Sequence, residues 1–125
     1  MTNPRDRKPH AKQRSMPKPP AAYTAFVLRF PLLGQAWDLV GEAGKSGPLT
    51  DREIRLVKLG IAVGAMREGA VHSSVRKAIA TGMSPAEIEQ VGALAAGTLG
   101  FPSAVAVYGW IRDLTGAARR PPRRR

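Results

Sequence analysis

Two segments of the chain carry the same helix-start signal, and they constrain the fold more than any other feature. They are residues 49–54 (LTDREI) and residues 83–88 (MSPAEI). In each, a hydroxyl side chain precedes a Glu by three residues, which is the spacing of a capping box, and apolar residues flank the pair at the positions of a hydrophobic staple. The sequence therefore predicts that helices begin near residues 51 and 85.

Apolar residues with helical spacing occur before, between and after these starts. The segment 31–42 begins with a proline, which suits the first position of a helix. The segment 54–65 is apolar on nearly every side, which predicts a central helix buried on most of its faces. The segment 67–81 carries one apolar stripe and is followed by a glycine, and further stripes cover residues 88–99 and 105–111. Because no segment alternates with a period of two, we expect an all-α bundle of about five to six helices.

The formal net charge of +11 would by itself suggest a nucleic-acid or membrane-surface partner. Most of this charge lies near the two ends of the chain. Residues 1–22 hold six Lys or Arg and one Asp, and residues 117–125 hold five Arg, so nine basic and eight acidic residues remain between them. A nucleic-acid-binding domain carries its basic residues on folded elements, among aromatic or polar readers. We therefore expect neither specific nucleic-acid binding nor membrane insertion.

Three regions follow from this distribution. Residues 1–22 combine five Pro with many charges and few apolar side chains, which predicts a disordered basic arm. Residues 23–116 are expected to form one helical domain, and residues 117–125 a disordered Arg-rich tail. A cytoplasmic protein is expected, because the sequence shows no apolar run of about eighteen residues and no hydrophobic leader. The lack of cysteine excludes disulfides, thiolate nucleophiles and Cys-ligated metals.

Glu68 and His72 are the strongest candidates for chemistry. They lie four residues apart in a predicted helix, so their side chains share one face about one turn apart. A carboxylate that orients an imidazole at the edge of an apolar pocket makes a general acid/base pair that needs no cofactor. Arg76, one further turn along, could hold a substrate carboxylate through two hydrogen bonds.

His72 also belongs to a longer spacing, Glu53-x11-Ala65-x2-Glu68-x3-His72. This spacing resembles the frame Glu-x11-Cys-x2-Cys-x3-His of the AhpD-like branch of the carboxymuconolactone decarboxylase superfamily, with Ala65 and Glu68 at the positions of the two cysteines. The resemblance continues through about residues 31–114, in the segments LTDREIRLVKLGIAVG, HSSVRKAIATGMSPAEIEQV and GTLGFPSAVAVYGWI. Several such blocks in the right order make the resemblance specific.

The resemblance implies a homotrimer or homohexamer of AhpD-like helical domains. It also implies a carboxy-lyase-like enzyme without a cofactor, in which His72, Glu68 and Glu53 perform acid/base chemistry on a small anionic lactone or carbonyl compound and Arg76 binds the substrate. An alternative of another class is a catalytically silent oligomeric domain that binds a ligand or partner. A third function, alkylhydroperoxidase activity of the AhpD type, is disfavoured because the chain has no cysteine.

Each candidate residue also has a simpler structural interpretation. Glu53 occupies the third position of a capping box, which alone accounts for a Glu there. Glu68 and His72 could form an ordinary surface pair, and Arg76 could be a solvated helix residue. Glu53, Glu68 and His72 also resemble a metal-binding set. Bundle metal sites usually draw Glu-x-x-His pairs from two helices, however, so no metal is predicted.

Overall fold

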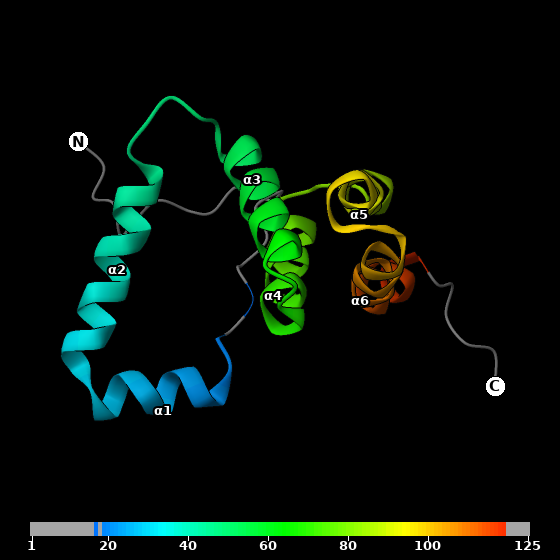
Figure 1. The fold of residues 1–125 in the computed structure, drawn as a ribbon. Helices are drawn as coiled ribbons and strands as arrows, with labels where there is room; N and C mark the ends of the chain where they lie inside the picture. The colour runs from blue at the N-terminus through cyan, green and yellow to red at the C-terminus, as the bar shows by residue number, and fades with distance from the viewer. Residues whose placement is uncertain (1–16, 18, 120–125) are drawn as a thin grey trace.

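The computed structural model describes residue 17 and residues 19–119, and these residues form α-helices without any strand. The helices, shown in Figure 1, are α1 (Ala21–Arg29), α2 (Pro31–Lys45), α3 (Asp51–Gly64), α4 (Glu68–Ala80), α5 (Pro85–Leu99) and α6 (Phe101–Arg119). The predicted all-α fold is confirmed. Most of the predicted arm and residues 120–125 of the predicted tail lie outside the described residues. Among the helices described, none is both long and apolar enough to cross a membrane.

Both predicted capping boxes are present, at the starts of α3 and α5. The Thr50 hydroxyl accepts the Glu53 backbone N–H at 3.1 Å, and the Glu53 carboxylate accepts the Thr50 backbone N–H at 2.8 Å. Ser84 and Glu87 make the same reciprocal pair at 3.2 and 3.0 Å. Arg52 also donates to the Glu87 carboxylate, so an ion pair joins the two helix starts. These contacts satisfy backbone donors that the first turn of a helix leaves unpaired.

Helices α3–α6 pack around one apolar core. The largest of its fully buried apolar side chains come from all four helices and are Leu59, Val71, Val75, Ile88, Val107 and Ile111. Helices α5 and α6 approach closely at Gly92, where an added Cβ would lie only 3.1 Å from Ile111 Cδ1. The turn after α4 contains Gly82 with φ +93°, the left-handed conformation expected of the glycine that follows this helix.

Helices α1 and α2 stand apart from this core, and we call them the α1–α2 arm. Neither helix contains a buried residue. Figure 1 shows the two helices joined at a corner that lies away from α3 and α4. Near this corner the rings of Phe26 and Phe30 pack with their centroids 5.6 Å apart. Large apolar side chains stay exposed, including Leu32 at 76%, so the arm presents an apolar surface that the single chain does not cover.

The prediction that α3 is buried on most sides is wrong for the single chain. Its buried residues are Leu59, Ala62 and Val63, whereas Ile61 on the opposite side is 65% exposed. The reason lies in the packing, because α3 packs against α4 and α5, and only Leu59, Ala62 and Val63 become buried. Its other apolar face is directed towards the α1–α2 arm, and a cavity separates the two.

Candidate functional site around His72

The turn between α3 and α4 determines where α4 begins. Ala65 is the C-cap of α3, and Met66 has φ 55°, a left-handed conformation that costs a residue other than glycine about 1–3 kcal/mol. Arg67 is the N-cap of α4 and Glu68 is its first residue, where a negative charge is favourable beside the helix dipole. The two positions that carry cysteines in the AhpD-like frame, 65 and 68, therefore flank a strained turn.

His72 meets a carboxylate from another helix. Its Nε2 lies 3.0 Å from Oδ2 of Asp113 in α6. Polar side-chain atoms of Glu68, His72 and Asp113 all lie within 4.8 Å of one another, and we call these three residues the His72 cluster. The His72 side chain is 23% exposed and that of Asp113 is 59% exposed. The imidazole therefore lies at the edge of the core, neither buried within it nor free in solvent.

The core brings the His72 cluster together. Val71, which precedes His72, and Ile111, two residues before Asp113, are both fully buried in the same core. Helices α4 and α6 therefore lie against each other, and residues at the margins of their buried faces meet. Sequence reasoning missed Asp113. The available signal was that Asp113 is the single acidic residue of the segment 101–119.

The contact with Asp113 decides which imidazole nitrogen is available for chemistry. A carboxylate accepts hydrogen bonds, so in the neutral ring Nε2 carries the proton and donates it to Asp113. The lone pair is then on Nδ1. The His72 cluster can therefore accept a proton at Nδ1 while Asp113 holds the orientation of the ring, which is the arrangement of many general acid/base pairs.

Glu53, the third residue predicted to be catalytic, lies at the far end of α3 from position 65. A rise of 1.5 Å per residue separates the two positions by about 18 Å along the helix axis. The Glu53 carboxylate accepts the Thr50 backbone N–H, and this bond lowers the pKa of Glu53, with a smaller contribution from the Thr50 hydroxyl. The structure shows Glu53 as a capping residue, and its catalytic role stays a prediction.

Arg76, predicted to bind substrate, follows His72 by one turn but borders a different hollow. It lines a cavity of about 750 Å³ together with Lys77 of α4 and with Tyr23 and Trp37 of the α1–α2 arm. Arg76 is thus next to the His72 cluster along α4 while facing the arm. Its role in substrate binding stays a prediction.

The His72 cluster could also hold a divalent cation, because two carboxylates and one imidazole are ligands that such ions accept. This set differs from the one considered from the sequence, since Asp113 takes the place of Glu53. The direct hydrogen bond between His72 and Asp113 already pairs one nitrogen with one oxygen. The arrangement is therefore held together without requiring a cation.

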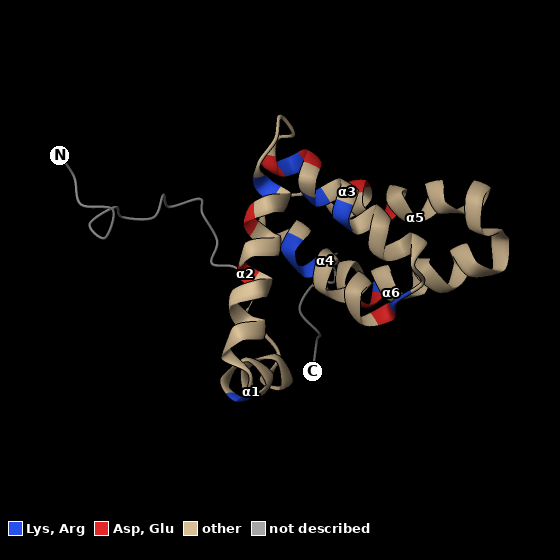
Figure 2. Cartoon of the chain, turned by 60° about the vertical axis from the view of Figure 1, so that its left-hand side comes forward, with Lys and Arg blue, Asp and Glu red and all other residues tan. Residues whose placement is uncertain are grey.

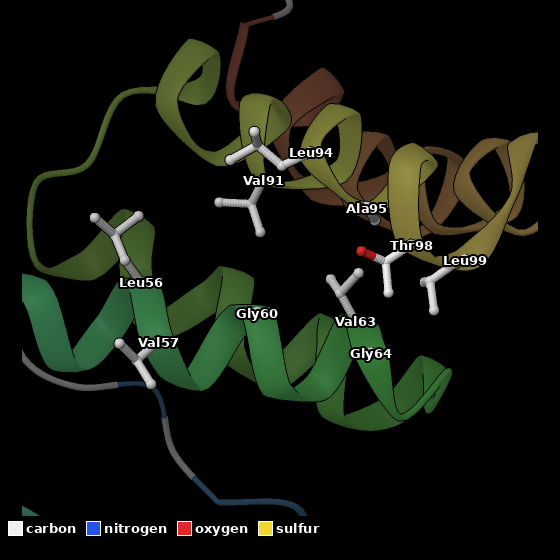
Figure 3. A pocket seen from close by; sticks show the side chains of 10 residues that line it. All are labelled: Leu56, Val57, Gly60, Val63, Gly64, Val91, Leu94, Ala95, Thr98 and Leu99. Carbon is white, nitrogen blue, oxygen red and sulfur yellow. The ribbon is translucent and has the colours of Figure 1, made fainter.

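A second concave region, the α3–α5 groove, lies away from the His72 cluster. Its volume is about 450 Å³, and Figure 3 shows aliphatic side chains such as Leu56, Val63 and Leu94 on its walls. Gly60 and Gly64 add no side chains to its α3 side, and Thr98 contributes a hydroxyl group. None of the residues that line this groove is ionisable, so it suits apolar contacts better than acid/base chemistry.

Comparison with known proteins agrees with the fold. Residues 31–113 match the Carboxymuconolactone decarboxylase family, a span that begins at α2 and ends at Asp113. No curated protein and no solved structure gives a significant match. The family match covers well over half of the chain and contains the complete His72 cluster. The chain therefore belongs to the carboxymuconolactone decarboxylase family.

Proposed function

We propose that this protein is a cofactor-independent enzyme that performs acid/base chemistry on a small anionic lactone or carbonyl compound, with His72 as the proton-transfer group. The observation that carries the proposal is the 3.0 Å contact between His72 Nε2 and Asp113, with Glu68 close to both. A carboxylate that orients an imidazole is what a general base requires. Membership of the carboxymuconolactone decarboxylase family supports the same class of reaction.

In the proposed carboxy-lyase step, the bond between the substrate carbon and its carboxylate breaks and CO₂ leaves. The electron pair of that bond enters the conjugated carbonyl group, which becomes an enolate. Nδ1 of His72 takes up a proton from solvent water before the reaction, and the imidazolium then donates this proton to the carbon, so the carbonyl is restored. Asp113 keeps its hydrogen bond to Nε2 throughout and stabilises the imidazolium by its charge.

A carboxylated substrate also needs a cation, because Glu68 and Asp113 repel its negative charge. We assign this role to Arg76, which lies one turn after His72 on α4. A guanidinium group binds a carboxylate through two parallel hydrogen bonds, which would also set the orientation of the substrate. In this arrangement the Arg76 contact determines binding, and His72 determines the chemical step.

Turnover of a panel of carboxylated lactones and β-keto acids tests the proposal. NMR would follow loss of CO₂ and incorporation of solvent deuterium next to the carbonyl. His72→Ala and His72→Asn are expected to lower kcat by about 10²–10⁴-fold, the usual contribution of a general acid or base. Asp113→Asn should lower kcat more than it raises KM, whereas Arg76→Gln should mainly raise KM.

Glu42→Gln, on an exposed position of α2, is the matched control and should keep the wild-type rate. Wild-type turnover by His72→Ala would overturn the assignment of His72. An unchanged KM in Arg76→Gln would contradict the assignment of Arg76 to substrate binding without affecting the assignment of His72.

A catalytically silent binding domain is the second candidate, and the exposure of the cluster favours it. The Asp113 side chain is 59% exposed, so water competes for the imidazole in the single chain. On this reading the His72–Asp113 contact only ties α4 to α6. Asp113→Asn would then lower the free energy of unfolding. The wild-type protein would convert no compound of the panel faster than buffer does.

A further inference from the structure

Four cations from three helices line one cavity. Arg55 and Lys58 of α3 and Lys77 of α4 border a hollow of about 450 Å³ whose opposite wall is α2, and we call it the cationic cleft. Figure 2 shows basic residues on α3 and α4 at the side nearest α2. The volume is within the range of small-molecule binding sites.

The charged residues that line the cationic cleft are all basic. Its lining contains no Asp or Glu, and Lys45 of α2 adds a further cation. The ion pairs found in the described part of the chain use other basic residues.

Lys77 shows the consequence of this arrangement. Its side chain is partly buried, and burial lowers the pKa of Lys77, with the positive charges of Lys58 and Arg55 as further causes. The charged form of Lys77 is therefore disfavoured in the folded chain. An anion bound in the cleft would offset both causes, because it would pair with the ammonium group and balance the neighbouring charges.

The remaining walls of the cationic cleft are mostly apolar. They include Trp37 and Val40 of α2 and Val57 and Ile61 of α3. The Trp37 side chain is more than half exposed and also borders the cavity that contains Arg76. A flat apolar group can pack against an exposed indole, while a charge at its edge reaches the cations.

We propose that the cationic cleft is a binding site for a small aromatic carboxylate, separate from the His72 cluster. The carboxylate binds Lys77, Arg55 and Lys58, and the aromatic ring packs against Trp37. An inorganic anion lacks the ring and a neutral aromatic compound lacks the charge, so neither should bind comparably. The inference does not depend on the proposed reaction, because none of the residues that line the cleft belongs to the His72 cluster.

Titration of the full chain with 2-naphthoate, followed by calorimetry, tests this inference. Lys77→Gln and Arg55→Gln are each expected to raise Kd at least tenfold, and Trp37→Leu should also raise it. His72→Ala and Arg112→Gln are the matched controls and should keep the wild-type Kd. Arg112 suits this purpose because its cation pairs with Glu89 instead of lining the cleft. Inorganic phosphate and 2-naphthamide serve as probes of charge alone and of ring alone.

Several results would overturn the proposal. One is the absence of 2-naphthoate binding by the wild-type chain at millimolar concentration, and another is an unchanged Kd in Lys77→Gln. Equal affinity for phosphate would indicate unspecific charge attraction, and equal affinity for 2-naphthamide an unspecific apolar surface. Loss of binding in His72→Ala would place the ligand at the His72 cluster instead. Lys77→Gln removes a charge that the fold disfavours, so the Tm of this variant should equal or exceed that of the wild type. A loss of affinity in this variant is then due to the missing ammonium group and not to unfolding.

Discussion

The α1–α2 arm and the α3–α6 bundle are both made of helices with apolar faces, yet only the bundle has a core. In α2 the apolar residues gather on one side, and the polar residues Gln35, Asp38 and Glu42 lie on the other. None of its residues is buried, whereas each bundle helix contributes to the core. The comparison teaches that an apolar stripe predicts the need for a covering surface without showing where that surface is.

Short helices without tertiary contacts are marginal in water, so we expect another copy of the chain to cover the arm. The homotrimer or homohexamer expected from the family resemblance would supply such a copy. The α3–α5 groove is a suitable receiving surface, because it is open and aliphatic (Figure 3). Four predictions test this difference between arm and bundle.

The first prediction compares two truncations of aliphatic side chains. Ile111→Ala empties a fully buried site in the bundle and should lower the unfolding free energy by about 2–5 kcal/mol at every protein concentration. Leu39→Ala in the arm should cost less than about 0.5 kcal/mol in dilute solution, because Leu39 is exposed in the single chain. Its effect should grow with protein concentration if the arm is covered by another copy. Urea unfolding at several concentrations measures both, and equal losses under dilution would contradict the division into arm and core.

The second prediction concerns assembly. Leu32→Asp combined with Leu39→Asp places charges on the apolar side of α2, so association should weaken at least tenfold and the protein should migrate as a monomer. Gln35→Asp adds a charge to the polar side of the same helix and should leave assembly intact. Light scattering coupled to size-exclusion chromatography measures the mass. A wild-type protein that is monomeric at micromolar concentration would contradict the expectation that another copy covers the arm.

The third prediction concerns helix starts. Thr50→Ala and Ser84→Ala each remove the hydroxyl of a capping box in the bundle and should cost about 1 kcal/mol. Ser46→Ala at the end of α2 removes a hydrogen bond to the Ala43 carbonyl. This substitution should lower the free energy of unfolding by only a few tenths of ~1 kcal/mol, because the bond is exposed to solvent. Thermal unfolding gives the three values. A loss in Ser46→Ala as large as in Ser84→Ala would show that the arm unfolds together with the bundle.

The fourth and smallest effect depends on pH. The pKa of Glu53 is lowered below its usual value of 4.5 by the hydrogen bonds from Thr50. Its ionised form therefore contributes stability above pH 4.5, and this contribution is lost as the pH falls through the folded-state pKa. Glu53→Gln should have a lower Tm than the wild type at pH 7, and the two Tm values should converge towards pH 3. Glu42→Gln, at an exposed position of α2, is the control. Its Tm difference from the wild type should not decrease between pH 7 and pH 3.

The local features of this protein follow from short stretches of its sequence. Thr50 with Glu53 and Ser84 with Glu87 begin helices where expected, because each capping box depends on residues only three positions apart. Gly82 takes the left-handed conformation for an equally local reason. The order of the motifs also identified the family, and the spacing of Glu68 and His72 placed both on one face of α4.

Which residues meet across helices depends on the packing of the whole bundle. Asp113 reaches His72 over 41 positions of sequence, and no local rule relates the two, because their contact depends on how α4 and α6 pack against the shared core. The same reason explains why Ile61 is exposed although its helix is apolar on most sides, and why Lys77 shares a cleft with cations of α3. Helical periodicity specifies a direction around one axis, whereas burial and charge neighbours depend on the positions of several axes at once.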